Sequence, residues 1–251
     1  RMTTRRLLAS PTLAAVLFPF ALGLVLEGAI RAGLISKFAI PLPSAILAAI
    51  PQLVTRNDLV GRFLSTAGLA VVSGILICVL GVLLGVLLYR FRRLGAAAEP
   101  LVAGFAAAPL ILAYPIFLVF FGRNPSALIA FATVGGLAPV VLKTTEGLET
   151  VRPVFRKVGQ TLRLTRRQAF FKIELPAALP TIVTGIRLGF VFGLIHLIAF
   201  EFLLNYGGLG GLVAEFSELY NPAATFAAIL FVIVLCALVI YVTERLEKWI
   251  R

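Results

Sequence analysis

The sequence predicts an all-α membrane protein with six transmembrane helices. The chain has 251 residues, of which 60% are hydrophobic and 14% are charged, and its mean hydropathy is +1.04. Soluble domains carry about 25% charged residues, so a water-soluble fold could not bury this much apolar surface. Uncharged runs long enough for the roughly 20 residues that cross a bilayer recur along the chain. We expect one integrated transmembrane domain over residues 1–251.

Five uncharged runs and one interrupted run account for the six spans. The uncharged runs are Leu7–Leu26, Phe63–Tyr89, Pro100–Gly122, Asn124–Leu142 and Leu219–Thr243. The interrupted run, Ala177–Leu204, contains Arg187, His196 and Glu201. The first run is longer than the apolar core of a signal peptide, so we expect it to be retained as a span.

The basic residues set the orientation of these spans. With both termini in the cytoplasm, 17 of the 23 Lys and Arg residues lie on the cytoplasmic side, five on the opposite side and one within a span. Cytoplasmic loops of membrane proteins carry such an excess of positive charge. The net charge of +12 is spread over four cytoplasmic segments, which favours contact with the lipid bilayer and no nucleic-acid partner.

Prolines lie before the second span and within the third and fourth spans. Two prolines in Phe38–Ser44 predict a turn that leads into a short external helix over Ala45–Val54. The third span contains Pro109, and the fourth contains Pro139. A proline frees backbone carbonyls that must be satisfied by neighbours or face a cavity, so these breaks either shape packing or mark a substrate route.

A basic loop lies between the fourth and fifth spans. Pro153 fits the first turn of one short helix, and Thr165-Arg-Arg-Gln168 matches the capping box that starts a second. The second helix should end before Pro176, because the residue ahead of a proline is pushed out of the α region. The predicted order is helix, turn, helix and then span.

The end of this loop, Ile173-Glu174-Leu175-Pro176, resembles the loop signature of permease subunits of type I ABC importers, in the nitrate, sulfonate, taurine and bicarbonate group. That signature has Glu-Ala-Ala, three residues, Gly, nine residues and Ile-x-Leu-Pro. Further matches cover most of the chain: Leu42-Pro43-Ser44, Pro109, Pro139, Thr184-Gly185-Ile186-Arg187-Leu188, Glu201 and Gly208-Leu209-Gly210. The resemblance implies the type I ABC importer permease fold.

The start of the signature is altered in this chain. Counting back from Pro176 puts Lys157-Val158-Gly159 at the Glu-Ala-Ala positions and Arg163 at the glycine. If that glycine serves a turn with positive φ, Arg163 would cost on the order of 1 kcal/mol there, so we expect the turn to be redrawn. Lys157 also reverses a charge where the resemblance places the partner ATPase.

The resemblance implies a division of labour among several subunits. Two permease subunits, as a homodimer or a heterodimer, would form the pathway for a small anionic solute in a bacterial cytoplasmic (inner) membrane. An extracytoplasmic substrate-binding protein would deliver the solute, and two cytoplasmic ATPase subunits would bind ATP and Mg²⁺. The chain has no Gly-x-x-x-x-Gly-Lys-Ser/Thr phosphate loop, so we expect a non-catalytic subunit with no cofactor of its own.

Two groups of candidate site residues follow from the resemblance and from the cost of burying polar groups in a membrane. Contact with the ATPase is assigned to the coupling loop, residues 152–176, through Arg156, Lys157, Gln160, Arg163, Thr165, Arg166, Arg167, Gln168, Leu175 and Pro176. The substrate-pathway candidates are Tyr114, Pro115, His196 and Glu201. A structural role is the alternative for His196, and Glu201 either holds the external segment Gly207–Gly211 or lines an outer gate. Arg187 is expected to pair with a carbonyl or carboxylate.

Two other classes of protein compete with an importer permease. An intramembrane enzyme would need paired acids, a Ser/His pair or a metal cluster, and a single histidine with no His/Cys/Asp grouping argues against it and predicts no metal site. A transporter or channel that works without ATP is the remaining alternative. Its expected inverted repeat is not visible in the sequence.

Overall fold

The computed structural model describes residues 11–36 and 40–250, and this part of the chain contains helices and turns but no strand. The longer helices are α2 (Pro11–Arg31), α4 (Leu59–Arg90), α5 (Arg92–Ala107), α7 (Pro125–Glu149), α10 (Leu175–Leu204) and α12 (Pro222–Ile250). The shorter ones are α3 (Pro43–Arg56), the 3-10 helix Leu110–Ala113, α6 (Tyr114–Phe121), α8 (Pro153–Thr161), α9 (Arg166–Ala169), the π-helical turn Phe170–Glu174 and α11 (Leu209–Glu218).

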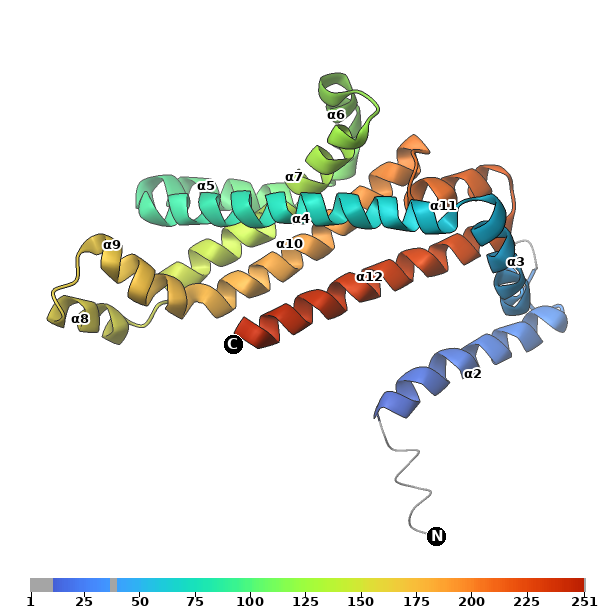
Figure 1. The fold of residues 1–251 in the computed structure, drawn as a ribbon, viewed down its shortest axis with the longest axis horizontal. Helices are drawn as coiled ribbons and strands as arrows, with labels where there is room; N and C mark the ends of the chain where they lie inside the picture. The colour runs from blue at the N-terminus through green and yellow to red at the C-terminus, as the bar shows by residue number, and fades with distance from the viewer. Residues whose placement is uncertain (1–10, 37–39, 251) are drawn as a thin grey trace, which may run out of the picture.

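Three long helices, α4, α7 and α10, form the centre of the molecule. Figure 1 shows α8 and α9 gathered at one end of these helices and α3 and α11 at the other end. The helices α7 and α10 meet at two glycines: a Cβ on Gly136 would lie 2.5 Å from the carbonyl oxygen of Gly189, and a Cβ on Gly189 would lie 2.8 Å from that of Gly136. Glycine is therefore required on both sides of this crossing, as expected where helices pack closely in lipid.

Four stretches are long and apolar enough to cross a membrane: α4, α7, α12 and the stretch Arg166–Glu218. This last stretch contains α10 and α11, which are separated by a turn at residues 205–208. A fifth candidate is α5 together with Leu110–Phe121, which are bent by 89° at the break between them. The first predicted span, Leu7–Leu26, begins outside the described residues, and its remainder lies in α2. Six spans with both termini cytoplasmic therefore stay a prediction.

Of the two predicted proline breaks, the one at Pro109 in the third span is present. Pro109 separates α5 from the 3-10 helix, and Ala108 before it has an extended backbone with ψ of 142°. The cause is the missing N–H of Pro109 and the steric restriction on the residue that precedes it. Pro100 lies inside α5 and Pro139 inside α7, so neither ends its helix.

The short helix predicted before the second span is present as α3, which begins with Pro43 in its first turn. Its early N–H groups have no partner within the helix, and α2 supplies one. The carboxylate of Glu27 accepts a hydrogen bond from the backbone N–H of Ser44 at 3.0 Å and from its hydroxyl at 2.7 Å. Glu27 also pairs with Arg31 at 2.7 Å, so the end of α2 and the start of α3 are held together.

Candidate coupling site and membrane cavity

The coupling loop forms two short helices, α8 and α9, joined by a tight turn at Arg163. Arg163 has a φ of 50°, in the left-handed region. Its N–H donates to the carbonyl of Gln160 at 3.0 Å, and the N–H of Leu164 donates to the carbonyl of Gly159 at 3.0 Å. These two bonds are the Schellman arrangement that ends many helices, usually with glycine in the left-handed position. The expectation that the turn is redrawn is wrong, because the hydrogen bonds keep the glycine-type turn with an arginine in it.

The second helix of the loop starts with the predicted capping box. The Thr165 hydroxyl accepts from the N–H of Gln168 at 3.3 Å, and the Gln168 side chain accepts from the N–H of Thr165 at 2.9 Å. Both side chains therefore shape the start of α9. Their assignment to ATPase contact stays a prediction.

The helical path that begins with α9 does not stop before Pro176, contrary to the sequence-based expectation. A π-helical turn over Phe170–Glu174 follows α9, and the N–H of Leu175 bonds to the carbonyl of Phe170. Leu175 keeps helical angles of φ −63° and ψ −47°, and Pro176 falls in the first turn of α10. Because α10 begins directly after the π-helical turn, Pro176 lies in the first turn of α10. Backbone N–H groups in a first turn have no partner within the helix, so the missing N–H of proline is tolerated there. The coupling loop therefore runs into α10 as continuous helix.

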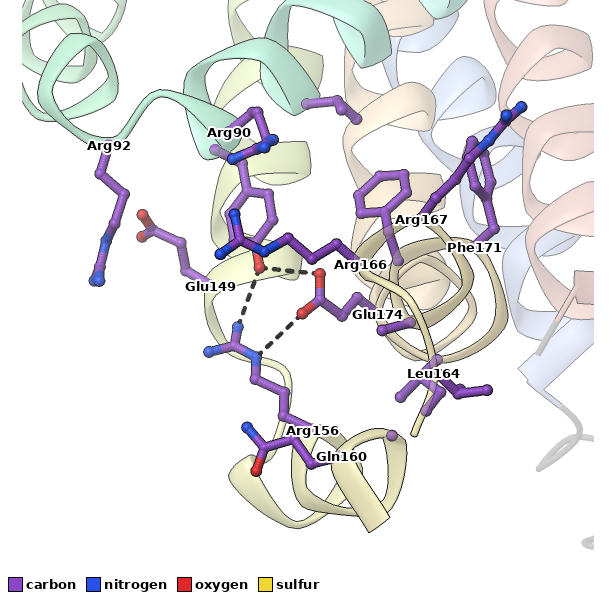
Figure 2. A pocket seen from close by; sticks show the side chains of 16 residues that line it. Arg90, Arg92, Glu149, Arg156, Gln160, Leu164, Arg166, Arg167, Phe171 and Glu174 are labelled. Carbon is purple, nitrogen blue, oxygen red and sulfur yellow. Dashed lines mark hydrogen bonds and ion pairs between the residues drawn. The ribbon is translucent and has the colours of Figure 1, made fainter. Parts of the chain in front are cut away.

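One carboxylate joins the coupling loop to the spans. Oε1 of Glu174 lies 3.6 Å from Nε of Arg156 in α8, and the hydroxyl of Tyr89 in α4 donates to Oε2 of Glu174 at 3.2 Å. Arg156 also donates to the carbonyl of Leu148 at 3.0 Å. Figure 2 shows these side chains converging between α4, α8 and the start of α10. Arg156, expected on the ATPase surface, is half-buried against its own chain.

Sequence reasoning missed the roles of Tyr89 and Glu174. Glu174 lies inside the quoted tetrapeptide Ile173-Glu174-Leu175-Pro176, and that position was the available signal. Tyr89 gave no signal, because its partners lie at least 67 residues further along the chain.

A cavity of about 840 Å³ lies between the coupling loop and the ends of α4 and α5. Of the predicted coupling residues, the cavity lining contains Arg156, Gln160, Arg166 and Arg167. Arg90 and Arg92 also line it. Lys157, Arg163, Leu175 and Pro176 are not in the lining. Lys157, Arg163 and Pro176 are exposed, whereas Leu175 is half-buried.

A second, smaller cavity of about 290 Å³ lies at the break between α5 and the 3-10 helix. Its lining contains Pro109 at the break, Gly135 and Pro139 of α7, and Phe192 and His196 of α10. Among the described residues that line it, His196 is the one ionisable side chain. Nδ1 of His196 lies 2.8 Å from the carbonyl oxygen of Phe192, and since a carbonyl only accepts, this nitrogen carries the hydrogen.

The other pathway candidates do not line this cavity. The ring of Tyr114 packs against Phe200 with centroids 6.5 Å apart, and Pro115 is exposed in the first turn of α6. Glu201 is fully buried on α10. Of the four candidates, His196 is the one that lines either of these two cavities.

Glu201 holds the start of α11, which was one of the two predicted roles. Both carboxylate oxygens of Glu201 lie 3.0 Å from the hydroxyl of Thr66 in α4, and one accepts from the N–H of Gly210 at 2.9 Å. The Thr66 hydroxyl accepts from the N–H of Leu209 at 2.8 Å. These bonds satisfy two of the free donors at the N-terminus of α11, at the opposite end of the molecule from α8 and α9.

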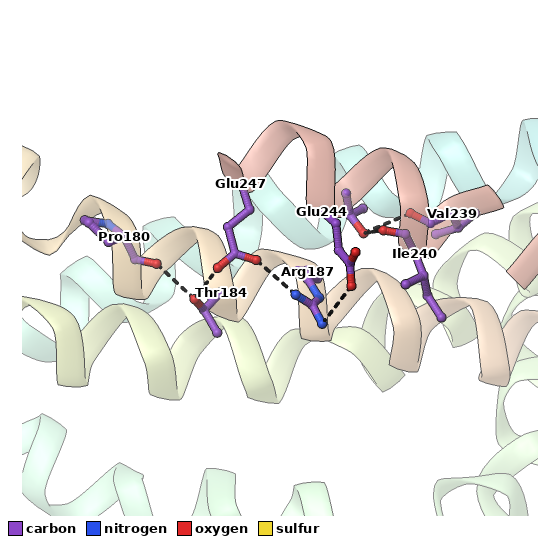
Figure 3. A network of polar contacts seen from close by, with 8 residues as sticks. Pro180, Thr184, Arg187, Val239, Ile240, Glu244 and Glu247 are labelled. Carbon is purple, nitrogen blue, oxygen red and sulfur yellow. Dashed lines mark hydrogen bonds and ion pairs between the residues drawn. The ribbon is translucent and has the colours of Figure 1, made fainter. Parts of the chain in front are cut away.

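Arg187 pairs with carboxylates of α12. It lies 3.1 Å from Glu247 and 3.4 Å from Glu244, and the hydroxyl of Thr184 donates to Glu247 at 3.2 Å. Figure 3 shows this network lying between α10 and α12. The pairing confirms the expectation that a charged residue inside a span finds a partner.

Long apolar helices, a broken span beside a cavity and a basic loop whose second helix continues into α10 are features expected of a membrane permease. The chain belongs to the family of binding-protein-dependent transport system inner membrane components, whose model matches residues 77–251. Its fold is that of type I ABC permeases, because it superposes on a chain of the MetNI methionine ABC transporter in an inward-facing conformation with a TM-score of 0.67. That match has 22% sequence identity and covers 77% of this chain and 96% of the other.

Relatives named as transport permeases match much of the chain. SsuC of Bacillus subtilis, named for aliphatic sulfonates transport, is 25% identical over 221 residues, which are 86% of this chain and 80% of that protein. ThiX of Halalkalibacterium halodurans, named for formylaminopyrimidine transport, is 28% identical over 68% of each chain. The nitrate import permease NrtB of Synechocystis is 30% identical over 53% of this chain and 48% of that protein.

Proposed function

We propose that this chain is one of two permease subunits of an ATP-driven importer in the bacterial cytoplasmic membrane. It crosses the membrane six times with both termini in the cytoplasm. Two ATPase subunits bind ATP and Mg²⁺ and receive the coupling loops, and an extracytoplasmic protein delivers the solute. The family, the fold and the names of the relatives support this assignment.

One observation carries the mechanism: the second helix of the coupling loop, α9, continues into α10 as a single helical path. From Arg166 the chain stays helical through the π-helical turn and along α10. Glu174, at the junction, contacts Arg156 of α8 and Tyr89 of α4. A displacement of α8 and α9 by a partner is therefore passed to two spans at once, because packed helices move as rigid elements.

The solute route is assigned to the cavity that His196 lines. The cavity lies beside a span that is broken at Pro109, and broken helices at membrane depth commonly mark transport sites. The side chains that line it are apolar except for the imidazole of His196. Because Nδ1 donates to the Phe192 carbonyl, Nε2 is left to face the solute, and it donates to an anionic solute only when the ring is protonated. Selection of the solute then falls largely to the extracytoplasmic binding protein.

Replacing the exposed arginines of the loop tests the coupling role. We expect Arg163→Glu/Arg166→Glu/Arg167→Glu to abolish solute-stimulated ATP hydrolysis by the reconstituted transporter, while the permease remains folded. Arg56→Glu, at the end of α3 at the opposite end of the molecule, is the control and should leave hydrolysis unchanged. Unchanged stimulation in the triple variant would exclude the loop as the coupling element.

A further inference from the structure

We propose that the cavity beside the coupling loop binds the headgroup of an anionic phospholipid from the cytoplasmic leaflet. The inference rests on the proposed function, which places the α8 and α9 end of the molecule at the cytoplasmic face. It adds a lipid partner at a site that would otherwise serve only the ATPase.

Charge is the first argument. Of the described residues, five arginines and two glutamates line the cavity. Glu174 is within 3.6 Å of Arg156 and accepts from Tyr89, so this carboxylate already has partners. The remaining arginines form no ion pair with any carboxylate in the described part of the chain; they are Arg90, Arg92, Arg166 and Arg167. A guanidinium is the side chain best suited to bind phosphate oxygens in pairs.

Position is the second argument. Arg90 is the last residue of α4, and Arg92 begins α5, so the two guanidinium groups lie where a span meets its cytoplasmic side. Arg166 of α9 extends toward Arg90 in Figure 2, and Arg167 lines the cavity beside Phe171. Basic pockets between transmembrane helices at this depth bind anionic headgroups.

The apolar part of the lining distinguishes a lipid from a soluble anion. Val86 of α4 and Phe170 and Ile173 of the π-helical turn line the cavity together with the arginines. A free phosphate gains nothing from these side chains, whereas the glycerol and upper acyl carbons of a phospholipid do. A volume of about 840 Å³ is large enough for a headgroup and these carbons, since ligand sites commonly measure about 300–1,000 Å³.

A bound headgroup would connect the loop to the spans. Its phosphate would contact α9 through Arg166 and the α4–α5 junction through Arg90, groups that the described chain leaves without ion pairs. The lipid would therefore complete the contact that Glu174 makes directly between α4 and the loop.

Native mass spectrometry of the permease–ATPase complex, released from nanodiscs of phosphatidylglycerol or phosphatidylcholine, tests the proposal. We expect retained phosphatidylglycerol on the wild type and about fivefold weaker retention for each arginine removed, hence about 25-fold for Arg90→Gln/Arg166→Gln. Arg152→Gln/Lys157→Gln is the control, because it removes the same charge from exposed loop residues outside the cavity lining.

Three results would overturn the proposal. They are unchanged retention in the cavity variant, an equal loss in the control, and displacement of the lipid by excess inorganic phosphate, which would indicate a soluble-anion site. ATPase copurification is measured in the same samples. If the cavity variant loses the ATPase but keeps the lipid, the cavity is an ATPase contact: the lipid proposal fails and the proposed function stands.

Discussion

Arg156 and Glu174 face each other across the coupling loop, with Nε of Arg156 3.6 Å from Oε1 of Glu174. The pair joins the first helix of the loop to the point where α10 begins. It also explains how the loop keeps its shape although Lys157-Val158-Gly159 departs from the family pattern. The residues that hold the loop lie on either side of the altered positions. Lys157 and Val158 are exposed, so they change the outer surface, whereas Gly159 is buried beside Ile173.

Removing this ion pair should affect coupling more than folding. Glu174→Gln keeps an oxygen that can accept from Tyr89 and removes the attraction to Arg156. Because both side chains are partly exposed, we expect a loss of about 0–1 kcal/mol of unfolding free energy, and up to about fivefold less solute transported per ATP. Thermal unfolding and transport in reconstituted vesicles measure the two effects. Lys172→Gln, an exposed neighbour, is the control, and an equal effect there would refute a specific role for the pair.

Replacing Arg163 by glycine should increase the unfolding free energy of the permease. Its φ of 50° strains any residue with a Cβ, so Arg163→Gly is expected to stabilise the permease by about 1 kcal/mol. Arg163→Ala keeps the strain and should give no gain. Unfolding in a denaturing detergent measures both variants. A destabilised glycine variant would show that the guanidinium, not the backbone, matters at this position.

The same pair of variants separates backbone strain from partner contact. If the Arg163 side chain contacts the ATPase, glycine and alanine should weaken ATPase copurification equally, although only glycine raises stability. Weakening by one variant alone would contradict a contact made by the side chain.

The sequence was sufficient for features that depend on near neighbours. The capping box of Thr165 and Gln168 joins residues three apart, and the break at Pro109 follows from proline chemistry. The continuation of helix past Pro176 was not predicted. It depends on the π-helical turn that joins α9 to α10, and this turn has no local sequence signal. Contacts such as Thr66 with Glu201, 135 residues apart, follow from helix packing and have no local signal.

The candidate site was predicted in part for the same reason. His196 was identified because an ionisable group in a span is costly, and the structure places it at a cavity. The arginines at the α4–α5 junction, Arg90 and Arg92, were assigned only to orientation. Their meeting with Arg166 is a tertiary feature that charge counting cannot show.

Thr66 should be essential for the start of α11. Thr66→Val removes the donor to Glu201 and the acceptor for the N–H of Leu209, leaving buried polar groups without partners. We expect a loss of about 1–3 kcal/mol of unfolding free energy, measured in a denaturing detergent. Thr66→Ser keeps the hydroxyl and should stay near the wild type. Similar losses in both variants would assign the effect to packing of the methyl group instead.

Gly135 and His196 should depend on each other. A Cβ on Gly135 would lie 2.5 Å from Cγ of His196, so Gly135→Ala must displace the imidazole and should cost about 1–3 kcal/mol. Adding His196→Ala removes the clash, and we expect most of that stability to return. An unfolding cycle over the four proteins measures this coupling.

Transport by the same variants tests the role of His196. If the imidazole contacts the solute, Gly135→Ala/His196→Ala should remain several-fold slower than wild type at limiting solute, despite its recovered stability. Wild-type transport in the double variant would restrict His196 to a packing role.

The pairing of Arg187 with α12 should matter more at Glu247 than at Glu244. The Glu247 side chain is 9% exposed and lies 3.1 Å from Arg187, whereas Glu244 is 41% exposed and lies 3.4 Å away. Arg187→Gln removes the guanidinium that lies 3.1 Å from this carboxylate, and we expect a loss of roughly 1–3 kcal/mol, reduced from a fully buried pair because Arg187 is 37% exposed. Glu244→Gln should cost less than about 1 kcal/mol, since exposed pairs contribute little. Unfolding of both variants in a denaturing detergent measures the difference, and equal losses would mean that burial of Glu247 does not set the strength of the contact between α10 and α12.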